Sequence, residues 1–337
     1  MTSAEPDLRP QARSHGAGRR RAPAFAALDL GTNNCRLLVA TPTPGGFRVV
    51  DAFSRIVRLG EGVSLSGVLS EAAMDRTIDA LKVCAAKIRR QSVARARTVA
   101  TEACRRAMNC QDFVERTRQA TGLDLEIISS GEEARLSLAG CAPLLDPSRP
   151  WALVFDIGGG STELSWARVV DGRPLVEGCV SLPLGVVTLG ERFPHGVNGA
   201  YADMVAEVRA MLEPFDAEHR ISEILADGGV QMLGSSGTVT TLAGVHLDLP
   251  RYDRNRVDGF LLGFEAIDEV TRRIAAMHVS ERERHPCIGR ERADLVLAGC
   301  AILEAICRRW PVGSVRVADR GVREGILLAL MAETGRA

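Results

Sequence analysis

Residues 153–163 have the sequence LVFDIGGGSTE, and this stretch decides the fold. Its apolar start is typical of a buried strand, and the three glycines after Asp156 are typical of a turn, because glycine adopts backbone conformations that other residues avoid. The same arrangement occurs earlier, where residues 26–33 have the sequence AALDLGTN. Asp29 and Asp156 lie 127 positions apart in the two stretches, so the sequence predicts a duplicated unit.

The elements after each turn also repeat. Both turns lead into a second predicted strand, a hairpin turn and a third predicted strand. These strands cover residues 36–40 and 47–53 in the first half, and 163–170 and 175–182 in the second. A helix over 71–90 is predicted next, since apolar residues recur there at steps of three and four and Ser70 is placed to cap it. Residues 202–215 form its counterpart in the second half.

The rest of the chain continues the alternation of strands and helices. A chain of 337 residues is long enough for two domains with separate cores. We expect an α/β protein with domain I over 24–137 and domain II over 138–337, the last helix returning to domain I. Residues 1–23 lack an apolar pattern and are predicted to be a disordered tail. Further strands are predicted at 98–101, 123–129, 230–233 and 314–318, and further helices at 111–120, 132–144, 238–245, 264–277, 293–308 and 324–331.

The composition excludes several classes of protein. No apolar run approaches the roughly 18 residues that a membrane helix requires, and the short apolar stretch near the N-terminus lacks the pattern of a signal peptide. A formal net charge of zero gives no overall field that would attract nucleic acid or membranes. Nine cysteines without CxxC spacing and six histidines without ligand spacing argue against disulfides and zinc. We expect a cytoplasmic protein with reduced, mostly buried thiols and no nucleic-acid or membrane partner; a homodimer is compatible with the sequence.

The glycine-rich turns are candidate phosphate sites. A single glycine turn is more often structural, and this interpretation applies to Gly31–Thr32–Asn33 when it is taken alone. Gly158–Gly159–Gly160–Ser161 has three glycines, which let backbone N–H groups converge on an anion, and a hydroxyl beside them. Gly234–Ser235–Ser236–Gly237 ends a strand and opens a helix, whose N-terminus attracts anions. A strand follows each of the first two turns, which excludes a P-loop or a Rossmann motif.

Three carboxylates adjoin the first two turns. Asp29, Asp156 and Glu163 offer hard oxygen ligands of the kind that Mg²⁺ prefers. The alternative is that each aspartate only caps its own turn. Two aspartates at equivalent positions of a repeat favour the metal.

The motifs together resemble the actin-like ATPase superfamily, and most closely the exopolyphosphatase and guanosine-pentaphosphate phosphohydrolase family. The resemblance covers about residues 24–330 in order. It implies two actin-like (ribonuclease H-like) domains with mixed sheets and an active site in the cleft between them. The segments that carry it are DLGTNNCRLLVA (29–40), TEACRRAMN (101–109), SSGEEARL (129–136), DIGGGSTEL (156–164), LGSSGTV (233–239), RVDGF (256–260) and ADRGVREGIL (318–327).

The resemblance also implies an activity and roles for residues. It implies a phosphohydrolase that uses Mg²⁺ and acts on polyphosphate or on guanosine penta- or tetraphosphate. The catalytic carboxylate is then Glu133, whereas Glu132 is only a helix-start residue, and Arg105 faces the phosphate. From the residues alone, both glutamates would be acids that stabilise a helix N-terminus. Arg36 is a further candidate for phosphate contact, and Arg106 and Arg292 are expected in surface salt bridges.

Two other functions stay open at this point. One is an ATP-dependent phosphotransferase related to sugar and acid kinases, and the other is a non-catalytic sensor of guanosine polyphosphates. We expect the chain to lack the C-terminal helical domain of the longer family members, and its sequence shows no long basic path. We therefore expect limited processivity and a preference for short polyphosphate chains.

Overall fold

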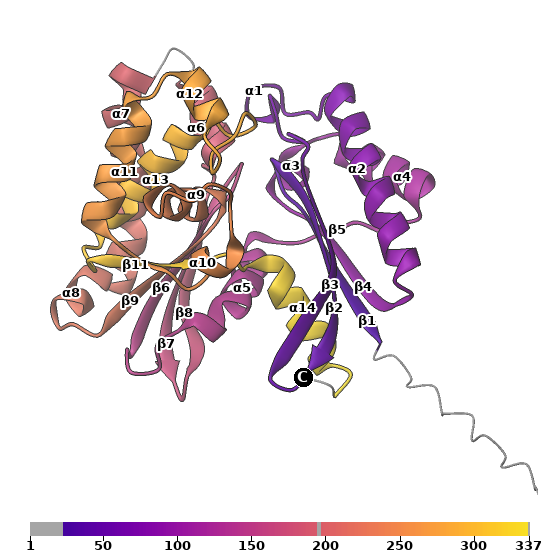
Figure 1. The fold of residues 1–337 in the computed structure, drawn as a ribbon, viewed down its shortest axis with the longest axis horizontal. Coiled ribbons are helices and arrows are strands. Elements are labelled where there is room, and N and C mark those ends of the chain that lie inside the picture. The colour runs from indigo at the N-terminus through magenta and orange to yellow at the C-terminus, as the bar shows by residue number, and fades with distance from the viewer. Residues whose placement is uncertain (1–22, 194–196, 336–337) are drawn as a thin grey trace, which may run out of the picture.

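The computed structural model describes residues 23–193 and 197–335. Apart from its last residue, the predicted tail lies outside these ranges. Two α/β halves lie side by side, each built around one sheet (Figure 1).

The first half is a mixed sheet with its helices. Its elements are β1 (Ala24–Leu30), β2 (Asn34–Thr43), β3 (Gly46–Ile56), α1 (Val63–Ser66), α2 (Glu71–Arg90), β4 (Val93–Ala100), α3 (Glu102–Arg106), α4 (Cys110–Thr121), β5 (Glu126–Ile127) and α5 (Ser130–Cys141). The strand order is β3-β2-β1-β4-β5. The β1–β2 and β2–β3 pairs are antiparallel, whereas β4 is parallel to β1 and to β5.

The second half repeats this arrangement. Its elements are η1 (Ala142–Leu144), β6 (Trp151–Ile157), β7 (Thr162–Val170), β8 (Arg173–Leu182), α6 (Val186–Arg192), α7 (Val197–His219), α8 (Ile221–Ala226), β9 (Val230–Ser235), α9 (Gly237–His246), α10 (Arg254–Val257), β10 (Leu261–Gly263), α11 (Phe264–Ala276), α12 (Val279–Arg284), α13 (Val296–Arg309), β11 (Ser314–Ala318) and α14 (Val322–Ala332). The order β8-β7-β6-β9-β11 matches β3-β2-β1-β4-β5, with the same parallel and antiparallel pairs. The predicted duplication and the mixed sheets are confirmed, and β10 is an added edge strand.

The predicted elements are found in their places but differ in length. The hairpin strands extend further than predicted, because their turns at 44–45 and 171–172 need only two residues each. The strand predicted at 123–129 is reduced to β5: Leu123 and Leu125 are buried in the core, and only the next two residues pair with β4. The short elements α3, α6, α8, α12 and β10 have too few residues to show a period, and the sequence did not predict them.

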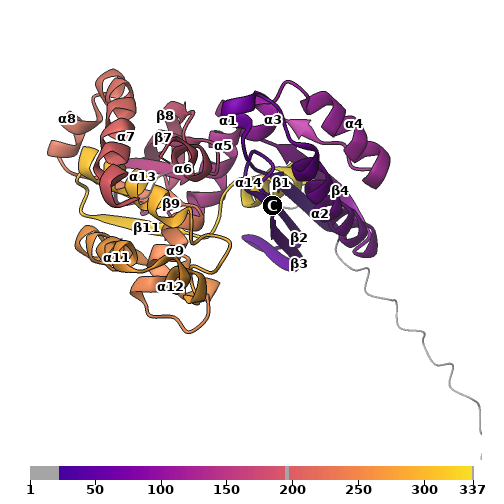
Figure 2. The same cartoon turned by 90° about the horizontal axis from the view of Figure 1, so that it is seen from above.

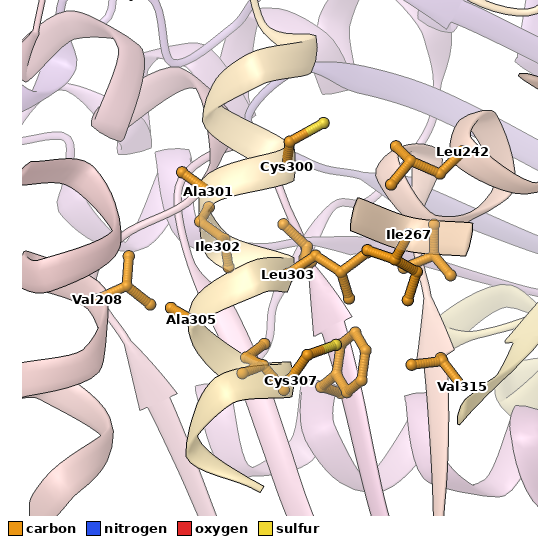
Figure 3. Close-up of a cluster of buried hydrophobic side chains, with 14 of the residues drawn as sticks. Val208, Leu242, Ile267, Cys300, Ala301, Ile302, Leu303, Ala305, Cys307 and Val315 are labelled. Atoms are coloured by element: carbon orange, nitrogen blue, oxygen red, sulfur yellow. The ribbon is translucent and has the colours of Figure 1, made fainter. Parts of the chain in front are cut away.

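Helix α13 lies at the centre of the larger core. Every residue from Val296 to Cys307 is buried, so the helix is enclosed on all sides. Figure 3 shows α13 between Val208 of α7 on one side and Leu242 of α9 and Ile267 of α11 on the other. The helix predicted at 293–308 is therefore the core of the second half.

The cysteines are structural. All nine are free thiols, and all except Cys179 are buried, which confirms the prediction from their spacing. Burial raises the pKa of Cys300 to about 12, so its thiol stays protonated. Within the described ranges, no helix is both long enough and apolar enough to cross a membrane.

Two helices connect the halves. Helices α5 and α14 lie between the sheets in both views (Figures 1 and 2). Ile326 and Leu327 of α14 pack against Phe25 and Leu38 of the first sheet. The last helix thus lies on the sheet formed by the first strands, and the predicted domain boundary after residue 137 falls inside α5.

The two connecting helices touch backbone to backbone. A Cβ atom on Gly140 of α5 would overlap Gly321 O, and one on Gly325 of α14 would overlap Leu136 O. Glycine at both positions lets the helices approach to a distance that no larger residue permits. The relative position of the two sheets depends on this crossing.

Gly140→Ala is expected to lower the free energy of unfolding by about 1–3 kcal/mol, the usual cost of forcing extra atoms into a packed site. Urea titration of the purified variant measures this. Gly131→Ala is the matched control, because it lies in the same helix and a Cβ atom there meets nothing within 4 Å. Equal stability of the two variants would show that the helix crossing tolerates a side chain.

Candidate active site

The two predicted turns are equivalent in their hydrogen bonds. Each turn is closed across its own residues and is held from behind by the segment that follows the third strand of its half. The paired bonds are Gly31 N to Asn34 O (2.9 Å) and Gly158 N to Ser161 O (2.9 Å) across the turns, and Gly60 N to Thr32 O (2.9 Å) and Val187 N to Gly159 O (2.8 Å) behind them.

The second turn directs two backbone N–H groups into a cavity. Gly158 O accepts from Val186 N at 3.0 Å and Gly159 O accepts from Val187 N at 2.8 Å, so both carbonyls point toward α6. The C=O and N–H groups of a trans peptide point in opposite directions. The N–H groups of Gly159 and Gly160 therefore point away from α6, and neither has a partner among the described residues. Both glycines line a cavity of about 110 Å³, called the small cavity below, where these donors are available to an anion.

The glycines also let the two turns touch each other. A Cβ atom on Gly160 would lie 2.5 Å from Thr32 Oγ1, and one on Gly159 would lie 3.1 Å from Asn33 N. The sequence predicts that these glycines expose backbone N–H groups to an anion, and the structure adds a packing requirement. Thr32 Oγ1 and Asn33 Oδ1 are buried without a hydrogen-bond partner in the described part of the chain. Both residues line the small cavity, as does Gly31.

The third predicted turn contributes less than expected. Ser236 Oγ accepts from two backbone N–H groups in the first turn of α9, at 3.1 and 3.2 Å, so the serine uses donors that were expected to face a ligand. Ser236 and Gly237 line the small cavity. Ser235 lines only a second cavity of about 730 Å³ that adjoins it. Gly234 lines neither cavity. It is required instead for packing, because a Cβ atom there would lie 2.6 Å from the ring of Phe155.

Cross-strand register brings charged side chains to the small cavity. Asp29 lies opposite Arg36 in the β1–β2 pair, and Asp156 lies opposite Glu163 at the equivalent position of the β6–β7 pair. Directly opposed residues have adjacent side chains, and all four line the small cavity. Burial raises the pKa of Asp29 to about 6 and that of Glu163 to about 7, and the charge of Asp156 also raises the pKa of Glu163.

Glu133, in the first turn of α5, lines the same cavity. Arg105 Nη1 donates to Glu133 Oε2 at 2.8 Å, and the same guanidinium donates to Glu102 Oε2 at 2.8 and 3.0 Å. Burial raises the pKa of Glu133 well above its ordinary value, Glu163 raises it further, and Arg105 opposes both effects. Such a carboxylate can accept a proton near neutral pH. The resemblance predicts that Arg105 faces the phosphate, but in the structure Arg105 lies outside the cavity linings and holds Glu133.

Comparison with known proteins decides the family. Residues 38–334 match the Ppx/GppA phosphatase family. The chain belongs to this family. Exopolyphosphatase 2 of Mycobacterium tuberculosis is 30% identical over 321 residues, which cover 90% of this chain and 98% of that protein.

Solved structures of the Ppx/GppA family have the same fold. The crystal structure of the Aquifex aeolicus family member is 29% identical, with a TM-score of 0.74, and the match covers 94% of this chain and 99% of that one. An exopolyphosphatase from Cytophaga hutchinsonii, at 23% identity, shares the fold with a TM-score of 0.83 over 92% of this chain and 98% of its own. The predicted family and α/β fold class are confirmed.

One arginine of this Ppx/GppA chain lies where the sequence did not predict it. Arg292 was expected in a surface salt bridge, but it lines the small cavity, and its Nη1 donates to Thr241 Oγ1 at 3.0 Å. Burial lowers the pKa of Arg292, and the nearby charge of Arg36 lowers it further. The prediction was wrong because the residues around position 292 are charged like a surface segment, and only the fold turns this side chain inward. Arg36 lines the cavity as expected, and Arg106 is exposed.

Asp29→Asn is expected to stabilise the protein in metal-free buffer above about pH 7. The pKa of Asp29 is about 6 in the folded chain and 3.8 as a free group. The folded state therefore binds more protons between these values, and stability falls as the pH rises through this interval. The uncharged amide of asparagine removes this loss of stability, which is on the order of 3 kcal/mol above pH 6.

Urea titrations of both proteins at pH values from about 4 to 7 measure this effect. The stability difference between variant and wild type should grow as the pH rises from the free pKa of 3.8 to the folded pKa of about 6, and it should stay constant above that pH. A variant that is less stable at every pH would show that Arg36 and its surroundings need the charge of Asp29 to fold.

Proposed function

We propose that this chain is a hydrolase that releases the terminal phosphate of inorganic polyphosphate. Membership of the Ppx/GppA phosphatase family and the similarity to a protein named exopolyphosphatase 2 support the choice of substrate. The observation that carries the proposal is the position of Glu133, which lines the same cavity as Gly159 and Gly160, whose N–H groups have no partner within residues 23–193 and 197–335. A base and an anion site in one cavity bring a water molecule and a phosphate together.

The residues around the cavity have distinct roles in this reaction. The N–H groups of Gly159 and Gly160 bind oxygens of the terminal phosphate, and Arg36 and Arg292 supply positive charge at the same cavity. Glu133 takes a proton from water as the water oxygen bonds to the terminal phosphorus. The bond from that phosphorus to the bridging oxygen breaks, and the bridging oxygen leaves with the electron pair on the shortened chain.

Arg105 acts behind Glu133 in this mechanism. Its guanidinium joins Glu133 to Glu102, and the side chains of all three are at most 17% exposed. This anchor fixes one carboxylate oxygen of Glu133 and leaves the other to accept the proton. The positive charge of Arg105 also opposes the burial that raises the pKa of Glu133.

Mg²⁺ is the proposed cofactor, and the residues present fit it. Asp29, Asp156 and Glu163 line one cavity, and burial raises the pKa of each, which a bound cation would offset. Across the described residues, no group of three or more His, Cys, Asp or Glu side chains is arranged to hold a metal ion alone. Mg²⁺ needs only one or two carboxylates when water and phosphate oxygens complete its shell. Bound there, it supplies positive charge to the phosphate oxygens.

Guanosine pentaphosphate is the second substrate to compare, because it ends in the same phosphoanhydride bond. Both substrates place a terminal phosphate in the small cavity. They differ in the group to which this phosphate is attached, a phosphate chain in one and a guanosine nucleotide in the other. Phosphate release from each under identical Mg²⁺ concentrations measures the preference.

Glu133→Gln is expected to lower the rate of phosphate release by about 10²–10⁴, the usual contribution of a general base. The amide keeps the size of the side chain but cannot take the proton from water. A steady-state phosphate assay on polyphosphate measures the rate. Substrate binding should change little, since the phosphate ligands are backbone N–H groups and arginines.

Glu132→Gln is the matched control, because it is the adjacent glutamate of the same helix turn. Its carboxylate pairs with Arg97 at 2.5 Å and does not line the small cavity. Its rate should stay within about twofold of wild type, since pairs of this kind contribute about 1 kcal/mol or less. Equal rates for the two variants would remove Glu133 from the mechanism.

A further inference from the structure

One guanidinium group holds two glutamates of the small cavity. Arg105 Nη1 donates to Glu133 Oε2 at 2.8 Å, while its Nε and Nη2 donate to Glu102 Oε2 at 3.0 and 2.8 Å. A further bond from Nη1 to Ile128 O, at 3.0 Å, fixes the guanidinium group. Glu102 and Glu133 line the small cavity and Arg105 does not, so this arginine holds two carboxylates at the cavity wall.

Each glutamate is held through only one of its oxygens. The bonds from Arg105 all reach Oε2, and Oε1 of Glu102 and Oε1 of Glu133 receive no hydrogen bond within residues 23–193 and 197–335. Both side chains are only 13% exposed. Carboxylate oxygens in such surroundings are normally hydrogen-bonded. Two of them without a partner at one cavity indicate a ligand that supplies hydrogen-bond donors or positive charge.

Glu102 also touches the turn that is proposed to bind the phosphate. A Cβ atom on Gly160 would lie 3.0 Å from Glu102 Cγ, so the two residues are in contact across the halves of the chain. The N–H group of Gly160 is one of the two backbone donors available to an anion in the small cavity. A ligand held by Glu102 therefore lies next to a phosphate held by Gly160.

Water fits the two free oxygens better than phosphate or a metal ion does. A phosphate oxygen is an anionic acceptor, so a carboxylate repels it. A metal ion would be repelled by Arg105, which bonds both glutamates directly, whereas Asp156 and Glu163 form no ion pair in the described part of the chain. A water molecule is neutral and has two hydrogens, one for each free oxygen.

We propose that Glu102 and Glu133 together hold the attacking water, which donates one hydrogen bond to the Oε1 atom of each. The inference rests on the proposed function and adds Glu102 to its reaction. Glu133 takes its proton as the water oxygen bonds to the terminal phosphorus, and the bridging oxygen leaves with the electron pair of the broken bond. Glu102 takes no proton and keeps its hydrogen bond to the remaining O–H group.

Holding both hydrogens turns a lone pair of the water oxygen toward the phosphorus, and such orientation lowers the barrier to reaction. Glu133 is the member that takes the proton, because burial raises its pKa well above the ordinary value. The sequence gives no sign of the role of Glu102, since this residue meets Gly160 and Glu133 only in the fold.

Glu102→Gln tests the proposal. The amide keeps the size of the side chain and its oxygen can still accept from Arg105, but an NH₂ group replaces the oxygen that accepts from water. The kcat for phosphate release from polyphosphate is expected to fall about 10- to 100-fold, through the loss of one hydrogen bond to a charged group. The KM should stay the same or fall, because the substitution removes a negative charge beside the bound phosphate.

The matched control is Glu115→Gln. Glu115 and Arg118 form an ion pair three positions apart in α4, as Glu102 and Arg105 do in α3, and Glu115 does not line the small cavity. Its kcat should stay within about twofold of wild type. Should Glu102→Gln not fold, Glu102→Asp replaces it: the charge beside Arg105 remains, the free oxygen is withdrawn by one methylene, and a similar loss of kcat is expected.

Three results would overturn the inference. A wild-type kcat in Glu102→Gln would mean that Glu102 only anchors Arg105, and a higher KM with unchanged kcat would mean that it only contributes to substrate binding. Weaker binding of Mn²⁺ to the free variant, measured as a Kd, would make Glu102 a metal ligand instead. In each case wild type still releases phosphate, so the proposed function is unaffected. Wild type without activity on any polyphosphate would refute both.

Discussion

The turn at residues 31–33 lies against the turn at residues 158–160, and the rest of the candidate site depends on this contact. A Cβ atom on Gly160 would lie 2.5 Å from Thr32 Oγ1, so the contact requires glycine. Because each turn ends the first strand of its sheet, the contact brings Asp29 and Asp156 to one cavity. The crossing of α5 and α14 also requires glycine, at Gly140 and Gly325. This crossing places the two sheets beside each other. Two glycine contacts thus position the charged groups of two sheets.

Burying charged side chains around the cavity lowers the stability of the free protein, and bound substrate would offset this loss. Burial raises the pKa of Asp29, Asp156, Glu163 and Glu133, and burial lowers the pKa of Arg292. These shifts mean that the folded chain holds both kinds of charge in surroundings less favourable than water. A cation beside the carboxylates and a polyanion beside the arginines would relieve both. Binding is then strengthened by groups that destabilise the free protein.

Much of this arrangement could be predicted from the sequence. The matching motifs around Asp29 and Asp156 indicated the duplicated sheets, and the resemblance led to Glu133, because each motif consists of residues that are close together along the chain. The packing requirement for Gly160 could not be predicted, since its contact with Thr32 joins positions more than 120 residues apart. The length of β5 was overestimated, because buried leucines alternate there without pairing.

Other features depend on residues that only the fold brings together, and they leave no pattern in the local sequence. Arg292 lies in a segment whose composition is that of a surface, and only the fold places it at the cavity, where it donates to Thr241. Arg105 was assigned to phosphate from its motif, whereas its contacts with Glu133 and Glu102 appear only when α3 and α5 are placed together.

In the proposed reaction, Glu133 activates water against a terminal phosphate held by the second turn. Phosphate release from polyphosphate by the purified chain with Mg²⁺ in water enriched in oxygen-18 tests this reaction. We expect each released phosphate to carry one oxygen atom from the solvent, with no added acceptor. Release that requires an alcohol or a carboxylate acceptor and carries no solvent oxygen would contradict it, because the chain would then be a phosphotransferase.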